Sequence, residues 1–262
     1  MNEQNLDYLK ENLKYLGFGD KLHEDLERGL KSGAAEFQLT QNSQVSKKPF
    51  EVTLNFRKSE STDRYFFNSY HASLKYANGE TKDQVFYLTN GKGVTAKEAY
   101  NLLEGRAVYK ELTNKGGETY KAWIQLDFDK KDKHNNHEVK QYHEAYGYDL
   151  KASLSRYSVS DLDGGEREKA LLHSLQKGNL QSIALATEVG VTKVFVEANP
   201  QYKSVRFYDS ELKRVPKERL EQYLKPEGAK EKSAKQEQKQ DVTEGVKQNA
   251  SRRQSRSRSA GM

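Results

Sequence analysis

Apolar positions in the first 35 residues recur at steps of three and four, which is the spacing of one helix face. A first stripe ends before Gly17, and a second follows Asp20, which can cap a helix, and ends near Gly33. The two stripes consist of Leu6, Leu9, Leu13 and Leu16, and of Leu22, Leu26 and Leu30. Two short helices with a tight connection predict a helical hairpin over residues 1–35.

From Phe37 the period of the pattern changes to two, which is typical of strands with one buried and one solvated face. The buried faces of two successive strands are predicted to hold Phe50, Val52, Leu54 and Phe56, and then Phe66, Tyr70, Ala72, Leu74 and Tyr76. The second strand runs into Asn78-Gly79, a strong hairpin signal, and the chain returns over residues 84–88. These residues predict an antiparallel meander.

One pattern occurs twice in the chain, over residues 95–128 and again over residues 166–209. Each copy has a short helical stretch, then a glycine, then strand-like runs. Aligning Gly105 with Gly178 also pairs Leu102 with Leu175, Leu112 with Leu185, Gly117 with Gly190, and Thr119 with Thr192. The sequence therefore predicts two related helix–strand–strand repeats. In the first copy, Thr95 and Glu98 have the spacing of a capping box at the start of the helix.

The predicted fold class is α+β, with antiparallel sheets, short helices, two related repeats and a disordered C-terminal tail. Residues 129–147 are polar and are predicted to form a loop, and Pro216 opens a short closing helix. The predicted organisation is a helical hairpin (1–35), a meander with the first repeat (36–128), a loop with the second repeat and closing helix (129–224), and a disordered basic tail (225–262).

The composition narrows the class of protein. Hydrophobic residues make up 34% of the 262 residues and charged residues 31%, so we expect a thin core in which sixteen Tyr and ten Phe carry much of the apolar area. The absence of Cys excludes disulfides and Cys nucleophiles. The first residues lack the pattern of a signal peptide, and no apolar run reaches the roughly 18–20 residues that span a bilayer. We expect a cytoplasmic protein without a membrane partner.

The basic character of the chain is concentrated in its tail. Residues 225–262 hold ten Lys and Arg against five Asp and Glu, whereas the rest of the chain holds 34 against 33. This segment has no aromatic residue and too few aliphatic residues to offset the entropy cost of ordering. Its last residues contain the predicted nucleic-acid-binding residues Arg252, Arg253, Arg256 and Arg258. Arginines in a flexible segment bind phosphates weakly and without sequence preference, and a solubilising tail is the alternative.

Histidines and carboxylates gather between residues 127 and 144, where His134, His137 and His143 could hold a metal. Hydrolytic zinc motifs place a Glu next to the first His, but Asn135 and Asn136 stand here. We therefore expect a solvated loop, no metal and no cofactor. The isolated histidines, which are His23, His71 and His173, are expected on the surface.

Two further patterns have simpler explanations than a site. The run NGKGVT over residues 90–95 suggests a phosphate loop but lacks the GxxxxGK[ST] spacing, so a strand-to-helix turn is expected. Five sheet tyrosines could form a stacking platform for bases, although core packing is the expected role. They are Tyr65, Tyr70, Tyr76, Tyr87 and Tyr120. No Gly-x-Ser-x-Gly motif is present.

Several long runs resemble an uncharacterised family encoded on conjugative transposons and related islands of anaerobic gut bacteria. They include MNEQNLDYLKENLKYLGFGDKL, RYFFNSYHASL, KEAYNLLEGRAVYKEL, GETYKAWIQLDF and VFVEANPQYKSVRFYDSELKRV, and the resemblance covers nearly all of residues 1–224. It implies a genomic setting of conjugation, mobilisation and DNA-processing genes, and it carries over no catalytic residue.

Together these features predict a non-enzymatic accessory protein of a mobile genetic element that acts by binding. The expected partner is nucleic acid, bound weakly through the tail, or a protein of the conjugation or DNA-processing machinery. The alternative is a protein-interaction or inhibitor module directed at a host factor, such as a restriction or defence enzyme.

Overall fold

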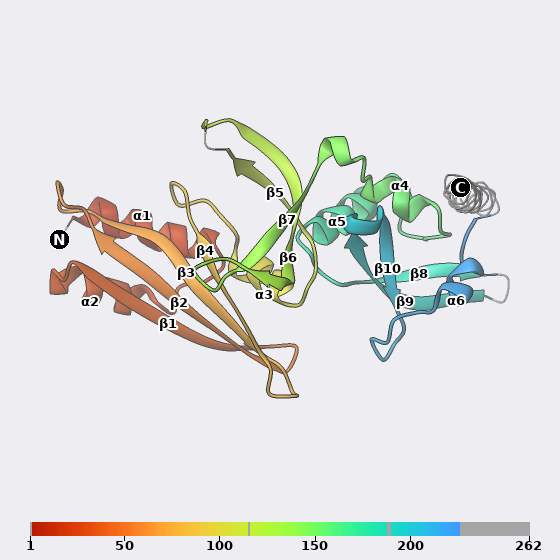
Figure 1. Cartoon of the computed structure of the whole chain (residues 1–262), viewed down its shortest axis with the longest axis horizontal. Helices are drawn as coiled ribbons and strands as arrows, with labels where there is room; N and C mark the ends of the chain where they lie inside the picture. The colour runs from red at the N-terminus through yellow and green to blue at the C-terminus, as the bar shows by residue number, and fades with distance from the viewer. Residues whose placement is uncertain (1, 115, 188–189, 226–262) are drawn as a thin grey trace, which may run out of the picture.

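The computed structural model describes residues 2–114, 116–187 and 190–225 (Figure 1). Over these residues the chain is an α+β protein with three antiparallel sheets and short helices, so the predicted fold class is confirmed. The predicted disordered tail, apart from Lys225, lies outside the described residues. In Figure 1 the second sheet lies between the other two along the length of the molecule.

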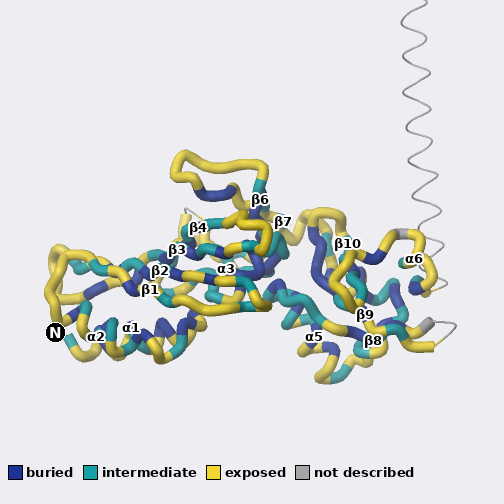
Figure 2. The backbone as a smooth tube through the Cα atoms, turned by 90° about the horizontal axis from the view of Figure 1, so that it is seen from below, coloured by how far each residue is buried: buried dark blue, intermediate teal, exposed yellow. Residues whose placement is uncertain are grey.

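The first sheet is the predicted meander, with the strand order β1-β2-β3-β4. Its strands are β1 (Glu36–Val45), β2 (Lys48–Lys58), β3 (Tyr65–Lys75) and β4 (Thr81–Tyr87). The predicted hairpin of α1 (Glu3–Tyr15) and α2 (His23–Ser32) lies beneath this sheet in Figure 2. Leucines of both helices pack with the buried strand residues in one hydrophobic cluster.

The start of α2 differs from the prediction. The residue before the helix is Leu22, which makes no side-chain cap, and Asp20 contributes its backbone carbonyl to the N–H of His23 instead of capping with its carboxylate. The end of the helix is as predicted, because Gly33 adopts a left-handed conformation with φ 71°.

The set of β3 residues that faces the core also differs from the prediction at one position. Phe67 is buried and Phe66 is 48% exposed, whereas Tyr70, Ala72 and Leu74 are buried as predicted. The cause is a β-bulge, because Asn55 pairs with Ser69 while Phe56 pairs with Phe67, so β3 has one extra residue. An extra residue reverses which side chains face the core.

Both predicted repeats are present and have the same order of elements. In the first, α3 (Ala96–Leu103) is followed by β5 (Val108–Thr113) and β6 (Thr119–Lys131); in the second, α5 (Glu166–Gln176) is followed by β8 (Gln181–Thr187), β9 (Gly190–Asn199) and β10 (Ser204–Tyr208). Gly105 and Gly178 follow the helices with φ 82° and 77°. The predicted capping box of Thr95 and Glu98 is present.

The registers of the two hairpins differ by one residue. Leu112 pairs with Tyr120, whereas its counterpart Leu185 pairs with Thr192, the counterpart of Thr119. The last pair of the first hairpin is Thr113 with Thr119, and that of the second is Thr187 with Gly190.

The predicted polar loop over residues 129–147 is wrong. β6 continues to Lys131, β7 (His137–His143) pairs with it, and a short 3-10 helix η1 (Glu144–Tyr146) follows. The second sheet therefore has three strands in the order β5-β6-β7, as the third has β10-β9-β8. β7 is an edge strand with mostly exposed side chains, so backbone pairing defines it and hydrophobic alternation does not.

Two hydrophobic clusters form the core, and β6 contributes to both. Ile124 and Leu126 belong to the cluster under the first sheet, whereas Trp123 belongs to the cluster around the third sheet. The third-sheet cluster also takes in Leu154 of α4 (Leu150–Ser155), and Leu220 of α6 (Lys217–Glu221) packs against it.

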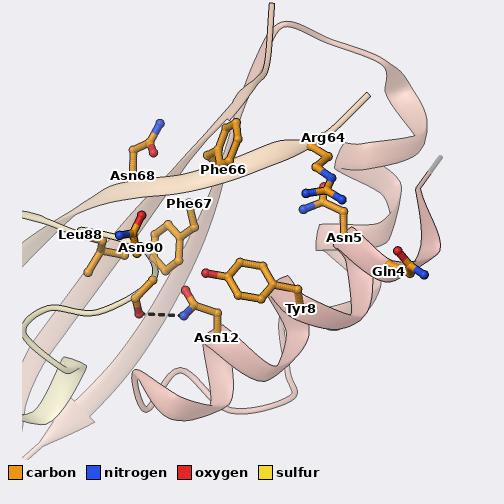
Figure 3. Close-up of a pocket in the computed structure, with 11 residues that line it drawn as sticks. Gln4, Asn5, Tyr8, Asn12, Arg64, Phe66, Phe67, Asn68, Leu88 and Asn90 are labelled. Atoms are coloured by element: carbon orange, nitrogen blue, oxygen red, sulfur yellow. Dashed lines mark hydrogen bonds between the residues drawn. The ribbon is translucent and has the colours of Figure 1, made fainter. Parts of the chain in front are cut away.

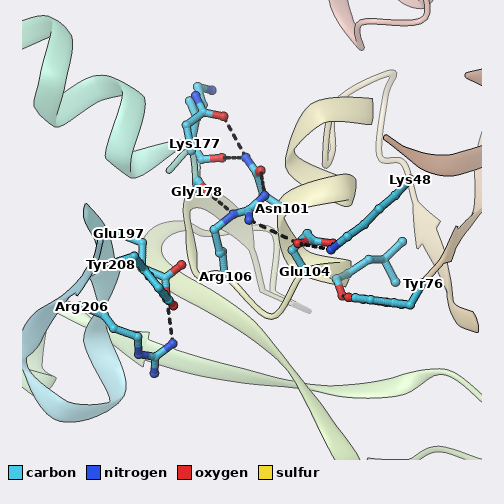
Figure 4. A network of polar contacts seen from close by, with 12 residues as sticks. Lys48, Tyr76, Asn101, Glu104, Arg106, Lys177, Gly178, Glu197, Arg206 and Tyr208 are labelled. Carbon is cyan, nitrogen blue, oxygen red and sulfur yellow. Dashed lines mark hydrogen bonds and ion pairs between the residues drawn. The ribbon is translucent and has the colours of Figure 1, made fainter. Parts of the chain in front are cut away.

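Polar contacts join the two repeats near the ends of α3 and α5 (Figure 4). Asn101 donates to the carbonyl of Lys177 at 2.7 Å, and Arg106 donates to the carbonyl of Gly178 at 2.9 Å. A Cβ on Gly178 would lie 2.9 Å from the carbonyl oxygen of Ala107, so only glycine permits this approach. The repeats therefore pack through their helix-terminating turns.

Candidate functional site

A pocket of about 400 Å³ opens between α1, the start of β3 and the loop that follows β4 (Figure 3). Side chains that line it are amides, aromatic rings, one leucine and one arginine: Gln4, Asn5, Tyr8, Asn12, Arg64, Phe66, Phe67, Asn68, Leu88 and Asn90. Its size is in the range of small-ligand sites. None of these residues is acidic, and Arg64 carries the only formal charge of the lining.

The floor of the pocket is the edge of β3 that β4 leaves uncovered. Asn5 occupies this edge beside Tyr65, where its Oδ1 accepts from the backbone N–H at 2.8 Å and its Nδ2 donates to the carbonyl at 3.0 Å. The N–H of Leu88 donates to the carbonyl of Asn68 at 2.8 Å further along. Phe67, which lies between these two contacts, also lines the pocket.

Asn12 presents a buried acceptor at the pocket. Its Nδ2 donates to the carbonyl of Gly91 at 2.8 Å, which fixes the orientation of the amide, because a carbonyl only accepts. Its Oδ1 is buried and has no hydrogen-bond partner among the described residues. A buried acceptor without a partner costs about 1–3 kcal/mol, so a ligand N–H or O–H donor would be stabilising here.

Gly91 allows the loop to come this close to α1. It has φ 72°, and a Cβ there would lie 2.4 Å from Nδ2 of Asn12 and 2.6 Å from the hydroxyl of Tyr8. Asn90 and Gly91 begin the NGKGVT run, which forms the predicted strand-to-helix turn between β4 and α3. That turn is therefore one wall of the pocket.

Exposed aromatic and cationic side chains complete the site. Tyr8 is 50% and Phe66 48% exposed, so both rings keep open surface for a planar ligand group. Arg64 is exposed at the β3 end of the pocket, and no ion pair found among the described residues involves it (Figure 3). The arrangement suits a ligand with a flat ring, a hydrogen-bond donor and a negative charge.

The residues predicted as sites are not among those that line this pocket. Arg252, Arg253, Arg256 and Arg258 lie outside the described residues. The three loop histidines are on β7 or its turn, and no metal-binding group of three or more His, Asp or Glu forms within the described ranges. His137 packs edge-on against Phe128, and His143 lies against Tyr120, with ring centroids 4.9 and 5.2 Å apart.

The five sheet tyrosines do not form one surface. Tyr65 and Tyr70 are buried in the core as expected, and the hydroxyl of Tyr76 donates to the carbonyl of Leu103. Tyr87 is 68% exposed on β4, and Tyr120 lies on another sheet. Of the aromatic residues that line the pocket, Tyr8 and Phe67 were not singled out from the sequence, and Phe66 was expected on the buried face of its strand.

Comparisons with protein-family models, with curated proteins and with solved structures find no match. The resemblance to the transposon-encoded family thus stays an expectation. None of the helices in the described ranges combines the length and apolar character needed to cross a bilayer.

Proposed function

We propose that the protein is a non-enzymatic binding protein for single-stranded nucleic acid, acting in the cytoplasm as an accessory protein of a mobile genetic element. The observation that carries the proposal is the pocket at the start of β3, where an unpaired amide acceptor, two exposed rings and an arginine surround one cavity. Single-stranded nucleic acids present bases that stack on aromatic rings and offer donors at their edges.

Each feature of the pocket has a role in this proposal. A base stacks on Tyr8 or Phe66, and Oδ1 of Asn12 accepts from an amino or imino group of its edge. Arg64 binds the neighbouring phosphate, which an acid-free lining does not oppose. A duplex cannot use this site, because its bases are stacked on one another.

The basic tail supplies affinity that does not depend on the sequence of the nucleic acid. Residues 225–262 carry twice as many basic as acidic residues, and a chain of such composition binds phosphates by releasing counterions. In this proposal the tail attracts the nucleic acid through its positive charge, and the pocket binds one base of the nucleic acid.

The test is fluorescence anisotropy with labelled single-stranded and duplex DNA and RNA over a salt series. Tyr8→Ala should weaken single-strand binding by about fivefold or more, the effect of losing one stacked base. The matched control is Tyr15→Ala, because Tyr15 is on the same helix and is 65% exposed outside the pocket. Arg64→Gln should reduce the slope of log K against log salt by about 0.7, the value for one phosphate contact.

Removal of residues 226–262 separates the two contributions. It should abolish most of the binding at low salt and leave the free energy of unfolding nearly unchanged, since Lys225 keeps its backbone bond to Arg156. Equal effects of Tyr8→Ala and Tyr15→Ala would contradict the pocket as the base site. If neither the full chain nor the truncated chain binds nucleic acid at low salt, the protein-interaction alternative takes its place.

A further inference from the structure

A row of three aromatic side chains crosses the second sheet. Tyr109 of β5 pairs directly with Trp123 of β6, and Trp123 pairs directly with Tyr142 of β7. Residues in direct register point to the same face of a sheet, so the three rings stand side by side. Tyr109 and Trp123 have ring centroids 5.3 Å apart.

These rings line a pocket of about 320 Å³ between the second sheet, the segment after η1 and α5. Trp123 is 5% exposed and forms the floor, whereas Tyr109 and Tyr142 are half-buried at the sides. Tyr148 adds a fourth ring, edge-on to Trp123 at 5.3 Å. A ligand group in this pocket would therefore meet aromatic rings from several directions.

The charges at the rim are mainly negative. Glu144 and Asp149 both line the pocket; Glu144 accepts from the hydroxyl of Tyr109 at 3.3 Å, and Asp149 caps α4 through the N–H of Ala152. Lys151 is the one lysine of the lining, and it forms an ion pair with Glu168. An anion would be repelled here, in contrast to the acid-free pocket beside β3.

We infer that this aromatic pocket binds an organic cation, namely an alkylammonium or guanidinium group. A cation is attracted to the faces of Trp and Tyr, most strongly to Trp, and rings that surround it from several sides form the aromatic cage that recognises quaternary ammonium groups. Glu144 and Asp149 add attraction at the opening. This inference is independent of nucleic-acid binding, because it uses a different cavity and the opposite ligand charge.

The alkylammonium or guanidinium group can belong to a free small molecule or to a Lys or Arg side chain of a protein. The chain contains a single tryptophan, Trp123, so its fluorescence reports on this pocket alone. Choline is titrated against its neutral isostere 3,3-dimethyl-1-butanol. A second arm uses a polar heptapeptide with a central Lys, and the same peptide with norleucine at that position.

We expect choline to change the Trp123 emission in a saturable way and the isostere to bind at least about fivefold more weakly, the effect of a cation–π contribution of about 1 kcal/mol. Tighter binding of the Lys peptide than of choline identifies a protein side chain as the source, and the reverse identifies a small molecule. Glu144→Gln should weaken either cation, with Glu138→Gln, an exposed acid on β7 outside the pocket, as its matched control.

Tyr142→Leu keeps apolar volume but removes one π face, and should weaken choline about two- to fivefold. Its thermal unfolding is measured in parallel, and the exposed Glu144→Gln variant carries the test if this one does not fold. The inference is overturned if no cation gives a saturable emission change, or if choline and its isostere bind equally. Equal binding to the Glu144→Gln and Glu138→Gln variants would overturn the role of Glu144.

Discussion

Asn5 pairs with Tyr65 as the backbone of a neighbouring strand would, giving and receiving one hydrogen bond at 3.0 and 2.8 Å. The two residues are 60 positions apart, and both side chains are buried. An edge strand exposes unpaired backbone groups, and here one side chain of α1 satisfies them. Helix α1 is thereby held in place along the edge that forms the pocket.

Asn5→Ala should lower the free energy of unfolding by about 2–4 kcal/mol, because it leaves the buried N–H and C=O of Tyr65 without partners. Urea denaturation measures the effect. The matched control is Asn42→Ala, an exposed asparagine of β1, which should change stability by less than about 0.5 kcal/mol. A similar loss in both variants would show that the Asn5 pair does not hold the edge.

Thr95→Ala should destabilise the fold by about 1 kcal/mol through loss of the N-cap of α3. The hydroxyl of Thr95 accepts from the N–H of Glu98 at 3.3 Å, and the carboxylate of Glu98 accepts from the N–H of Thr95 at 2.9 Å. The denaturation midpoint is compared with that of Thr113→Ala, an exposed strand residue. An unchanged midpoint in Thr95→Ala would mean that the cap contributes nothing.

Gly178→Ala should be more destabilising than Gly105→Ala, although both glycines have φ near 80°. An alanine at either position costs about 1 kcal/mol for the left-handed conformation. At Gly178 its Cβ would also meet the backbone of Ala107 at 2.9 Å, whereas at Gly105 the nearest atom is a ring carbon of Phe128 at 3.4 Å. Thermal unfolding of the two variants gives the comparison, and equal shifts of Tm would contradict the close approach.

The buried carboxylate of Glu98 should make stability depend on pH. Burial raises the pKa of Glu98, but Lys110, the N–H of Thr95 and Lys177 together outweigh it, so the pKa lies below its usual value. A carboxyl with a lowered pKa stabilises the fold above its unfolded pKa of about 4.3, and this contribution is lost as the pH falls through the folded pKa. Between pH 5 and 3, Glu98→Gln should therefore lose less stability than the unchanged protein.

The measurement is the free energy of unfolding from denaturant titrations at several pH values. Other carboxyls with lowered pKa, such as Asp127 and Glu168, remain in the variant, so only part of the acid dependence should disappear. Glu111→Gln, which removes an exposed carboxyl on β5, serves as the control. Its free energy of unfolding should depend on pH as strongly as that of the unchanged protein. If the free energy of unfolding of Glu98→Gln depends on pH as steeply as that of this control, the predicted contribution of Glu98 is wrong.

The repeats and the meander were predictable because their signals are local. Helix stops such as Gly105 and Gly178, and the Thr95–Glu98 box, depend on neighbours within a few residues. The β-bulge near Phe67 was not predictable, because Phe66 and Phe67 are both apolar and the sequence is compatible with either of them on the buried face. Strand β7 was missed because its backbone is paired while most of its side chains are exposed, which leaves no hydrophobic alternation.

The pocket could not be predicted because its parts are distant in the chain. Asn12 and Gly91 are 79 positions apart, and neither belongs to a recognisable motif. The one local signal was the NGKGVT run, whose first two residues form a wall of the pocket through backbone shape and not through a phosphate-loop motif. The aromatic row on the second sheet needs the register of three strands, which alternation alone does not give.

Trp123 and Ile124 are consecutive in β6, and each is buried in a different hydrophobic cluster. A strand between two cores covers both of them. If β6 leaves one core on unfolding, the other core is exposed to water as well. Neither core then has a separate stability, and heat or denaturant should unfold both cores in one cooperative transition. We expect a surface substitution beside one core to leave the other core intact, whereas a displacement of β6 should disturb both cores.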